Sequence, residues 1–225
     1  MDMDKFTIGG KKAELYRAAS ENRPLVLFNN FTESGDGVMR ALREINCHDL
    51  NFLCVGGLDW DCDLSPWYCP PPTKDDAPFS GGADEYLKLL LIEILPSARE
   101  LIKGAPPRVC IAGYSLAGLF ALYALYKCDV FDGAASISGS LWFPRFREYA
   151  CENQLKRIPD KIYLSLGDRE ARTKHPLLKT VQDCTELIAE HFGDQGIDVT
   201  YELNPGNHFK DAELRSAKGI TAIVR

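Results

Sequence analysis

The sequence predicts an α/β fold in which helices cover both faces of a mostly parallel central sheet. Short apolar runs alternate along the chain with longer amphipathic segments, and strands that alternate with helices form parallel sheets. Several of the short runs are apolar almost throughout, which is typical of strands whose two faces are both covered. The 225 residues contain no repeat and no long linker rich in Pro, Gly or Ser. We therefore expect a single domain spanning residues 1–225.

Strands are expected where a short apolar run stands between turn residues. Two leading strands are expected at 6–8 and 13–18, and polar and apolar residues roughly alternate in the second of them. The later runs are more uniformly apolar and should form the buried part of the sheet. These later runs lie at 24–28, 51–55, 108–112, 133–138, 161–166 and 199–203.

Amphipathic segments between these runs predict the helices, at 37–46, 82–103, 116–127, 144–156, 174–192 and 209–218. Pro96 lies inside the second of them and should kink or restart it. Only about twenty residues separate the strand ending near Ser138 from the next strand at Lys161, which is fewer than a cap domain needs. We therefore expect no cap domain and an open site.

Charge and hydropathy exclude several classes of function. The formal net charge of −6 argues against a nucleic-acid partner, because a duplex binder needs a basic face to neutralise phosphates. The longest apolar run, at 87–95, contains Lys88 and Glu93 and is too short to span a bilayer, so no membrane partner is expected. The first residues are acidic and do not resemble a secretory signal, and we expect a cytoplasmic protein.

The cysteines and acidic residues predict neither a disulfide scaffold nor a metal site. Cys54 and Cys110 stand within apolar runs, where a thiol acts as a small hydrophobic group. The chain has no CxxC pair, so a structural zinc site is not expected. Asp59, Asp61 and Asp63 alternate as in a calcium loop, but the glycine and the glutamate that such a loop requires are missing. We expect no metal and no cofactor.

One stretch carries the most specific motif of the chain. An apolar strand leads into the sequence GYSLAG at 113–118 and then directly into a helix. A nucleophile elbow has this context, because its serine occupies a tight turn and needs small residues two positions before and after it. Gly113 and Ala117 stand at those positions. We predict that Ser115 is a nucleophile and that the backbone N–H of Leu116, at the helix N-terminus, stabilises an oxyanion.

A serine hydroxyl needs a base, and one of the four histidines follows the last expected strand. His48 precedes a strand and should therefore lie at the opposite end of the sheet. His175 stands at an expected helix N-terminus, and His191 ends a helical run, where a cation meets the helix dipole favourably. His208 lies in the turn NPGNHF after the last strand. We predict that His208 is the general base.

The acid is expected in the loop after the strand at 161–166, which gives the chain order serine, acid, histidine of α/β-hydrolases. That loop contains two carboxylates, Asp168 and Glu170. Glu170 is favoured because it lies deeper in the loop and its longer side chain can reach the histidine. Asp168 stays the alternative acid, although it could instead cap the turn or pair with Arg169.

Two further loops are expected at the same edge of the sheet. The loop after the strand at 24–28 should supply the second oxyanion donor, for which we favour the backbone N–H of Phe31. The loop at 58–72 follows another strand and should overhang the site. Aromatic side chains there and nearby are expected either to bind an aryl or other apolar acyl group or to pack the loop against the protein body, namely Trp60, Trp67, Tyr68 and Trp142.

In these motifs the chain resembles the putative-esterase family of α/β-hydrolases, which includes esterase D, feruloyl esterases, enterochelin-type siderophore esterases and the antigen 85 mycolyltransferases. The resemblance implies an α/β-hydrolase fold and a triad of Ser115, Glu170 and His208. The oxyanion loop of that family usually begins His-Gly, whereas this chain has Asn29 and Asn30. The resemblance rests on GYSLAGLFALYA at 113–124, SGSLWF at 138–143, GDRE at 167–170 and GNHF at 206–209.

We therefore expect a serine esterase that cleaves a carboxylic ester through an acyl-enzyme on Ser115. Its expected partner is a small-molecule ester, with aryl and siderophore-like esters as candidates. An acyltransferase or a thioesterase would use the same triad and stays open as an alternative. A non-catalytic α/β-hydrolase scaffold that binds a ligand or partner is the alternative from another class. The sequence does not determine the oligomeric state.

Overall fold

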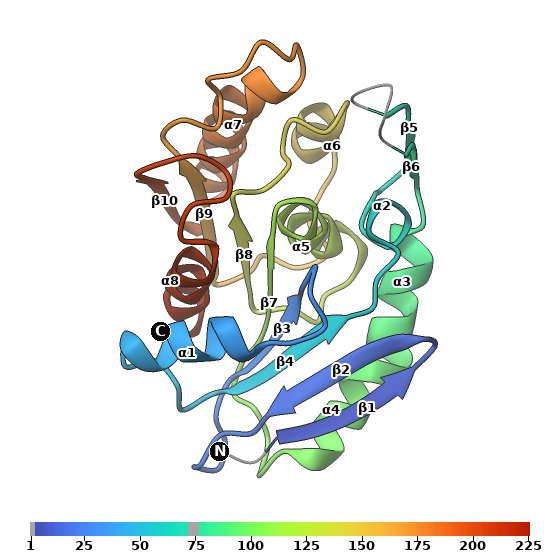
Figure 1. Ribbon diagram of the computed structural model, residues 1–225, viewed down its shortest axis with the longest axis vertical. Helices are drawn as coiled ribbons and strands as arrows, with labels where there is room; N and C mark the ends of the chain where they lie inside the picture. The colour runs from blue at the N-terminus through green and yellow to red at the C-terminus, as the bar shows by residue number, and fades with distance from the viewer. Residues whose placement is uncertain (1–2, 72–76) are drawn as a thin grey trace.

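The computed structural model describes residues 3–71 and 77–225, which are built around an eight-stranded sheet (Figure 1). The strand order is β1-β2-β4-β3-β7-β8-β9-β10. The pairs β1–β2 and β2–β4 are antiparallel, and the remaining neighbours are parallel, which confirms the predicted mostly parallel sheet. These strands are β1 (Met3–Ile8), β2 (Lys11–Tyr16), β3 (Leu25–Asn29), β4 (Asn51–Gly56), β7 (Val109–Tyr114), β8 (Gly133–Ile137), β9 (Lys161–Gly167) and β10 (Asp198–Asn204).

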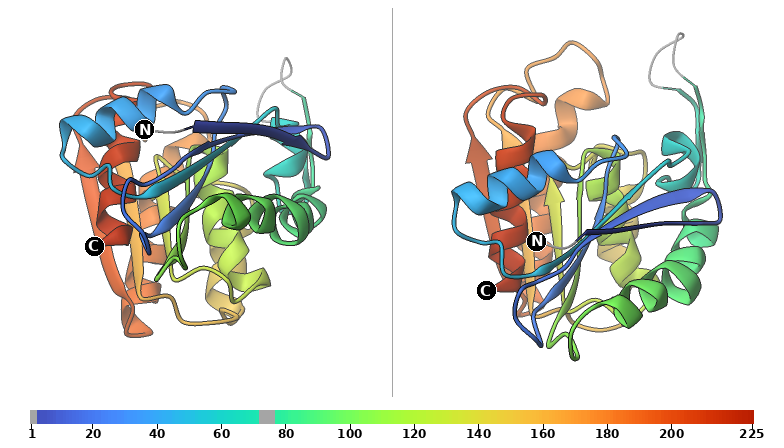
Figure 2. Two further views of the ribbon diagram at one scale, coloured as in Figure 1. Left: turned by 90° about the horizontal axis from the view of Figure 1, so that it is seen from below. Right: turned by 60° about the horizontal axis from the view of Figure 1, so that its bottom comes forward.

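Helices cover both faces of this sheet, as the sequence predicts (Figures 1 and 2). Helices α1 and α8 lie side by side on one face, while α3 to α7 pack on the other. A short hairpin of β5 (Tyr68–Cys69) and β6 (Phe79–Ser80) stands beside the sheet. The helices are α1 (Asp36–Glu44), α2 (Trp60–Asp63), α3 (Ala83–Leu89), α4 (Leu95–Leu101), α5 (Leu116–Lys127), α6 (Phe146–Glu152), α7 (Val181–Asp194) and α8 (Ala212–Val224).

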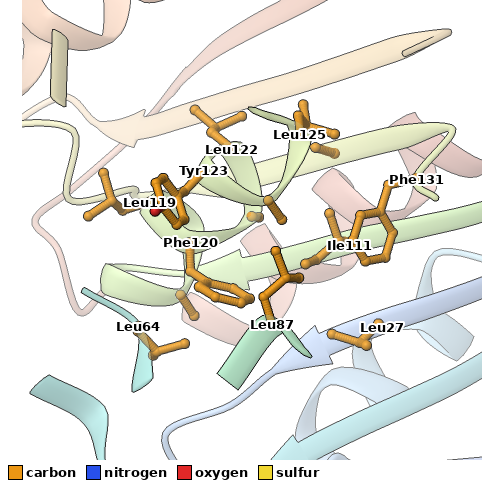
Figure 3. Packing of buried hydrophobic residues seen from close by; sticks show 14 of the residues in the cluster. Leu27, Leu64, Leu87, Ile111, Leu119, Phe120, Leu122, Tyr123, Leu125 and Phe131 are labelled. Atoms are coloured by element: carbon orange, nitrogen blue, oxygen red, sulfur yellow. The ribbon is translucent and has the colours of Figure 1, made fainter. Parts of the chain in front are cut away.

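The central strands are mostly apolar because each of their faces meets a different core. Successive residues of a strand point to opposite faces, and Leu27 and Phe28 of β3 accordingly belong to different buried clusters. Helix α5 runs through the larger cluster and is buried from Leu116 to Tyr126, so it has no polar face. Figure 3 shows Phe120 of this helix beside Leu87 of α3, with Ile111 of β7 nearby.

The buried thiols behave as small core groups, as the sequence suggests. Cys54 of β4 and Cys110 of β7 are fully buried. Burial raises the pKa of both thiols to about 12, which keeps them protonated and unreactive at neutral pH. Across the described ranges, each helix also falls short of the length and apolar character that a bilayer-spanning segment requires.

Several expected helices differ from the observed ones in their ends. The segment predicted at 82–103 is interrupted by a π-helical turn at Leu90–Ile94, directly before Pro96. A proline cannot donate an amide hydrogen bond to the preceding turn, and the wider π turn moves the helix out of register there. The helix expected at 144–156 is confined to α6. The one expected at 209–218 instead forms α8, which begins at Ala212 and extends to Val224.

The leading strands and two other segments also differ from expectation. The first two strands are shifted toward the N-terminus and form a regular hairpin, β1 and β2. The helix expected at 174–192 begins with a 3-10 turn at Leu178–Thr180 before α7. The loop expected at 58–72 contains α2, and its last residue, Pro72, lies outside the described residues.

Candidate active site

The strand order reverses between β3 and β7, and this switch point locates the site. The chain passes from β3 to β4 on one side of β3, while β7 pairs with β3 on its other side. In open parallel sheets a crevice forms beyond the carboxyl ends of two such strands, because their following loops diverge. Asn29 ends β3, and Ser115 follows directly after β7.

Ser115 occupies a strained turn between β7 and α5. Its φ of 59° and ψ of −123° are unusual for a residue with a side chain. The turn is fixed on both sides, since the Ser115 N–H donates to the Ile137 carbonyl at 3.0 Å and its carbonyl accepts from the Gly118 N–H at 3.0 Å. A Cβ at Gly113 would lie 2.3 Å from the Ala117 carbonyl oxygen, so a glycine is required there. The methyl group of Ala117 is therefore accommodated.

His208 connects Ser115 with the loop after β9. Its Nε2 lies 3.1 Å from Ser115 Oγ, and its Nδ1 lies 2.7 Å from Glu170 Oε2. A carboxylate is only an acceptor, so Nδ1 must carry the proton and Nε2 is left free to accept one from the serine. Tyr114 supports the backbone of this histidine, because its hydroxyl donates to the His208 carbonyl at 2.5 Å.

Glu170 is held as an anion in a nearly closed pocket beneath His208. Its side chain is 4% exposed, and its Oε1 accepts hydrogen bonds from Ser138 Oγ at 2.8 Å and the Gly167 N–H at 2.5 Å. Burial alone would raise the pKa of this carboxyl. The hydrogen bonds from His208, Gly167 and Ser138 and the charge of His208 outweigh burial, so the pKa lies below its ordinary value.

Asp168, the alternative acid, has a different set of partners. Its Oδ1 accepts from the Gly206 N–H at 2.8 Å, and its own N–H donates to the Asn204 carbonyl at 2.8 Å. The Arg169 N–H also donates to the Gly206 carbonyl at 3.0 Å. Asp168 therefore joins the loop after β9 to the loop at 205–211 that carries His208, and the geometry favours Glu170 as the acid.

The other three histidines lie away from Ser115. His48 lines a separate groove with Arg17, Arg43 and Lys103. His175 Nδ1 accepts hydrogen bonds from the N–H groups of two following residues at a turn. On α7, His191 Nε2 lies 2.8 Å from the side-chain amide nitrogen of Gln195, which directly follows the helix.

Two backbone N–H groups are the candidates for stabilising an oxyanion. Leu116 begins α5, where the first N–H groups of a helix have no partner within it. On the β3 side, the Asn30 N–H is used in a hydrogen bond to the Val55 carbonyl at 2.9 Å. The N–H of Phe31 makes no hydrogen bond to another described residue. The Phe31 N–H therefore stays the predicted second oxyanion donor.

A cleft of about 660 Å³ opens beside Ser115 and His208. Its apolar wall includes Phe31, Trp60 and Phe209, and the ring of Phe31 meets that of Trp60 edge to face. Its charged lining residues are both acids, Asp36 and Glu213.

Three of the four expected substrate-binding aromatics do not line this cleft, and this part of the sequence prediction needs correction. Trp67 is half-buried against Phe143 and Tyr149, and its Nε1 donates to the Pro144 carbonyl at 3.1 Å. Trp142 packs on Phe79, and Tyr68 lies on the exposed hairpin. Trp67 and Trp142 are taken up by packing among neighbouring rings, which leaves Trp60 alone of the four at the cleft.

Sequence reasoning missed several residues of the site. Ser138 supports Glu170, and Ser140 places its Oγ 3.4 Å from Ser115 Oγ. Both lie in the SGSLWF motif, which was a signal for their importance. Phe209 follows His208 directly and is 84% exposed. Arg215 bonds to Glu170 from α8, and no local motif marks it.

Comparison with known proteins agrees with this architecture. A sequence model of the family described as "Putative esterase" matches residues 52–211, most of the chain. The chain belongs to this family. The suspected membership in a family of α/β-hydrolase esterases is thereby confirmed.

Individual relatives are more distant. An uncharacterized protein, YbbA of Bacillus subtilis, is 26% identical over 156 residues, which cover 66% of this chain and 62% of that protein. The chain therefore matches less than two thirds of that relative's length. Among solved structures, the siderophore hydrolase EstA from Aspergillus nidulans is 19% identical with a TM-score of 0.76, covering 97% of this chain and 93% of EstA. An IroE-like serine hydrolase from Shewanella oneidensis is 15% identical with a TM-score of 0.80, covering 97% of this chain and 78% of that hydrolase. These similarities confirm the fold.

Proposed function

We propose that the protein is a serine esterase that hydrolyses a carboxylic ester through an acyl-enzyme on Ser115. The observation that carries this proposal is the position of His208, whose two ring nitrogens lie within hydrogen-bond distance of Ser115 Oγ and Glu170 Oε2. Family membership supports the same chemistry. A serine, a base and a buried carboxylate in this order form the arrangement that activates a hydroxyl.

In the first step, His208 Nε2 takes the proton of Ser115 Oγ while that oxygen attacks the ester carbonyl carbon. The carbonyl oxygen becomes an oxyanion, which the N–H groups of Leu116 and Phe31 stabilise. The tetrahedral intermediate then expels the alcohol, which receives the proton from His208. A water molecule attacks the acyl-enzyme with the same base, and the acid is released as Ser115 regains its proton. Glu170 stays ionised and keeps Nδ1 protonated throughout.

The cleft supports an apolar or aryl ester as the substrate. Phe31 is 75% exposed and Phe209 is 84% exposed, so both rings are available to contact an apolar group. The connection from β8 to β9 contains only the short helix α6, which leaves room for a bulky ester. Similarity to proteins described as siderophore hydrolases makes a siderophore-like ester a candidate. The acids Asp36 and Glu213 disfavour an anionic group in the cleft.

The test is hydrolysis of p-nitrophenyl esters with short acyl chains and with aryl acyl groups. We expect turnover by the purified protein and a loss of at least about 10³-fold in kcat for Ser115→Ala and His208→Ala. A fluorophosphonate should label Ser115, as read by mass spectrometry of the digested protein. Circular dichroism and thermal unfolding check that both variants remain folded.

Either of two results would contradict the proposal. If the wild-type protein neither hydrolyses the esters nor takes up the label, Ser115 is not an active nucleophile, and a ligand-binding scaffold becomes the better account. If turnover survives in Ser115→Ala, a different residue carries the reaction. Release of the acyl group to an added alcohol in preference to water would identify an acyltransferase.

A further inference from the structure

Arg215 is among the largest fully buried side chains of the described residues, with 2% of its surface exposed. It lies near the start of α8 and contacts Glu170 Oε1, whereas His208 contacts Oε2. A buried guanidinium is costly unless its donors are paired, because it loses strong interactions with water. The partners of Arg215 therefore indicate why the fold keeps a charge at this position.

Those partners come from the segments that hold the triad. The two hydrogens of Nη1 are shared among three acceptors, Glu170 Oε1 at 3.3 Å, Ser138 Oγ at 3.3 Å and the Asn207 carbonyl at 3.1 Å. Nη2 donates to the Pro205 carbonyl at 3.0 Å. A single planar group thus fixes the acid and two carbonyls of the loop at 205–211, which carries His208.

Among the described residues, no hydrogen bond or ion pair joins Arg215 to Ser115 or to the His208 ring. Its connection to Ser115 passes through Glu170, whose second oxygen accepts the His208 Nδ1 hydrogen bond. The ends of β7 and β8 add to the same cluster, since Tyr114 Oη lies 3.5 Å from Nη1 and Ser138 follows β8. Arg215 is thus placed to affect both the geometry and the charge of the Glu170–His208 pair.

We propose that Arg215 is a positioning residue, which holds Glu170 and the His208 loop in place and whose charge favours the unprotonated form of the pair. This inference rests on the proposed esterase function. The guanidinium stays charged at all working pH values, so it stabilises the Glu170 carboxylate and opposes the addition of a proton to the pair.

The other groups near the pair set the background for this effect. Tyr114 contacts this cluster from β7, and the Tyr201 hydroxyl on β10, which bonds to Glu186, lies within electrostatic range of Glu170. Asp168 lies on the same loop as Glu170, and the acids Asp36 and Glu213 line the adjoining cleft. Within the described residues, Arg215 is the cation paired with the Glu170 carboxylate, and His208 adds a positive charge only when both of its ring nitrogens carry protons. Removal of Arg215 therefore leaves a cluster in which acids predominate.

The chain offers a matched control on the same helix. Lys218 lies one turn further along α8, and its Nζ donates to Glu202 Oε1 at 2.5 Å and to Asn204 Oδ1 at 3.0 Å. Arg215→Met and Lys218→Met both remove a paired cation from α8, but only the first is in contact with the triad. Arg215→Lys retains the charge and loses the fork of donors.

The experiment measures kcat and KM for a p-nitrophenyl ester as a function of pH. It compares the wild type with Arg215→Met, Arg215→Lys, Lys218→Met and Glu170→Gln. Two double variants combine Glu170→Gln with Arg215→Met or with Arg215→Lys. We expect Arg215→Met to lower kcat about 10- to 100-fold with little change in KM. The midpoint of the acid limb of kcat/KM should rise by about half to one pH unit, because the pair then takes up a proton more readily. In Arg215→Lys this midpoint should lie close to the wild-type value, because the charge is retained. Lys218→Met should match the wild type in both kcat and the midpoint.

The double variant separates positioning from a general effect on folding. If Arg215 acts through Glu170, Arg215→Met costs less than about 3-fold in the Glu170→Gln background. The proposal would be overturned if the kcat losses of Arg215→Met and Glu170→Gln multiplied in the double variant. It would also be overturned if Arg215→Met left the midpoint of the acid limb unchanged. If near-ultraviolet circular dichroism finds Arg215→Met unfolded, the cycle of Arg215→Lys with Glu170→Gln decides in the same way. If the wild type itself does not hydrolyse the ester, the proposed function is refuted. That result is distinguishable from a failure of the Arg215 proposal, in which the wild type is active.

Discussion

Asp168 and Glu170 stand two positions apart on one loop, yet the fold gives them different partners. The side chain of Glu170 is almost fully buried and bonds to His208, whereas that of Asp168 is 45% exposed and accepts the Gly206 N–H. One carboxylate therefore meets the base, and the other joins two loops. Substitution by the corresponding amide keeps the shape of each side chain and removes its charge, which distinguishes the two roles.

Glu170→Gln should lower kcat by about 10³- to 10⁴-fold, since an amide can hold the histidine in the wrong tautomer and does not stabilise the imidazolium. Asp168→Asn should change kcat by less than about 3-fold and lower the free energy of unfolding by about 1 kcal/mol through the weakened loop contact. Ester hydrolysis and urea unfolding measure the two quantities. A larger loss of kcat in Asp168→Asn than in Glu170→Gln would show that the acid is Asp168.

The lowered pKa of Glu170 also predicts how stability depends on pH. The unfolded chain binds a proton at this carboxyl more readily than the folded protein does, so the stabilisation is complete above the unfolded-state pKa of about 4.5. It is lost as the pH falls through the lower pKa of the folded state. We expect the difference in free energy of unfolding between the wild type and Glu170→Gln to shrink as the pH falls from 7 to 3. A difference that stays constant over this range would contradict the assigned cause.

Residues whose role depends on distant contacts were beyond the reach of sequence reasoning. Ser115 and His208 could be predicted because a tight turn and a loop after the last strand leave local patterns. Arg215 reaches Glu170 across 45 positions and Ser138 across 77, and neither separation follows from any periodicity. A lone arginine in an amphipathic helix is typical of a solvated face, so its burial could be learned only from the packed structure.

At the scale of elements, the turn from β7 to α5 brings strand, nucleophile and helix into contact. Ala117 lies against Gly113, and the absent Cβ of that glycine provides the space. Ala at this position therefore fits the turn, although the pattern with glycine is the more usual one. The requirement for a small residue is strict before the serine and weaker after it.

Two matched substitutions test this asymmetry. Gly113→Ala should reduce kcat by more than about 100-fold or prevent folding, because the added Cβ would lie 2.3 Å from a backbone oxygen. Ala117→Gly should keep activity within about 3-fold and cost about 1 kcal/mol in helix stability. Ester turnover and thermal unfolding are the measurements. Equal tolerance of both changes would mean that the turn relaxes, contrary to our account.

Aromatic residues in the loops at the carboxyl edge of the sheet have two roles, packing against the protein body and lining the cleft. The sequence could not show which residue has which role. Trp67 packs among several aromatic rings, while Phe209 meets the His208 ring edge to face and is otherwise exposed beside the cleft. Aromatic residues in a loop suit either role, and only the path of the loop decides between them. The strand pattern was easier to predict, because buried parallel strands are apolar throughout. Helix ends were harder, because packing sets them as much as local sequence does.

Phe209→Ala should therefore raise KM for an aryl ester about 3- to 10-fold, with little change in kcat and less than about 0.5 kcal/mol lost in stability. Trp67→Ala should instead lower stability by about 2 to 3 kcal/mol and leave KM unchanged in the folded protein. Steady-state kinetics with aryl and acetyl esters and urea unfolding check both variants. An unchanged KM for the aryl ester in Phe209→Ala would exclude this ring from substrate binding.

At the scale of the whole molecule, charge favours neutral substrates. The net charge is −6, and the cleft is lined by Asp36 and Glu213, with no lysine or arginine among its lining side chains. A concave surface with low-dielectric walls concentrates such a field at its mouth, where a substrate enters. The electrostatic potential is thus expected to be negative at the cleft, as it is for the protein as a whole.

This field predicts a salt dependence that differs between two esters of similar size. The p-nitrophenyl monoester of succinic acid, an anion, should have a lower kcat/KM than p-nitrophenyl butyrate at 10 mM salt. Its value should rise toward 1 M salt, as the screening length falls from about 30 Å to about 3 Å, while the neutral ester changes little. Glu213→Gln should raise kcat/KM for the anionic ester about 3-fold at low salt, whereas Glu190→Gln, on the surface of α7, should not. Both variants change the net charge equally. If they raised kcat/KM for the anionic ester to a similar degree, the repulsion would come from the overall charge of the molecule. A larger effect of Glu213→Gln places it in the cleft, as the lining residues indicate.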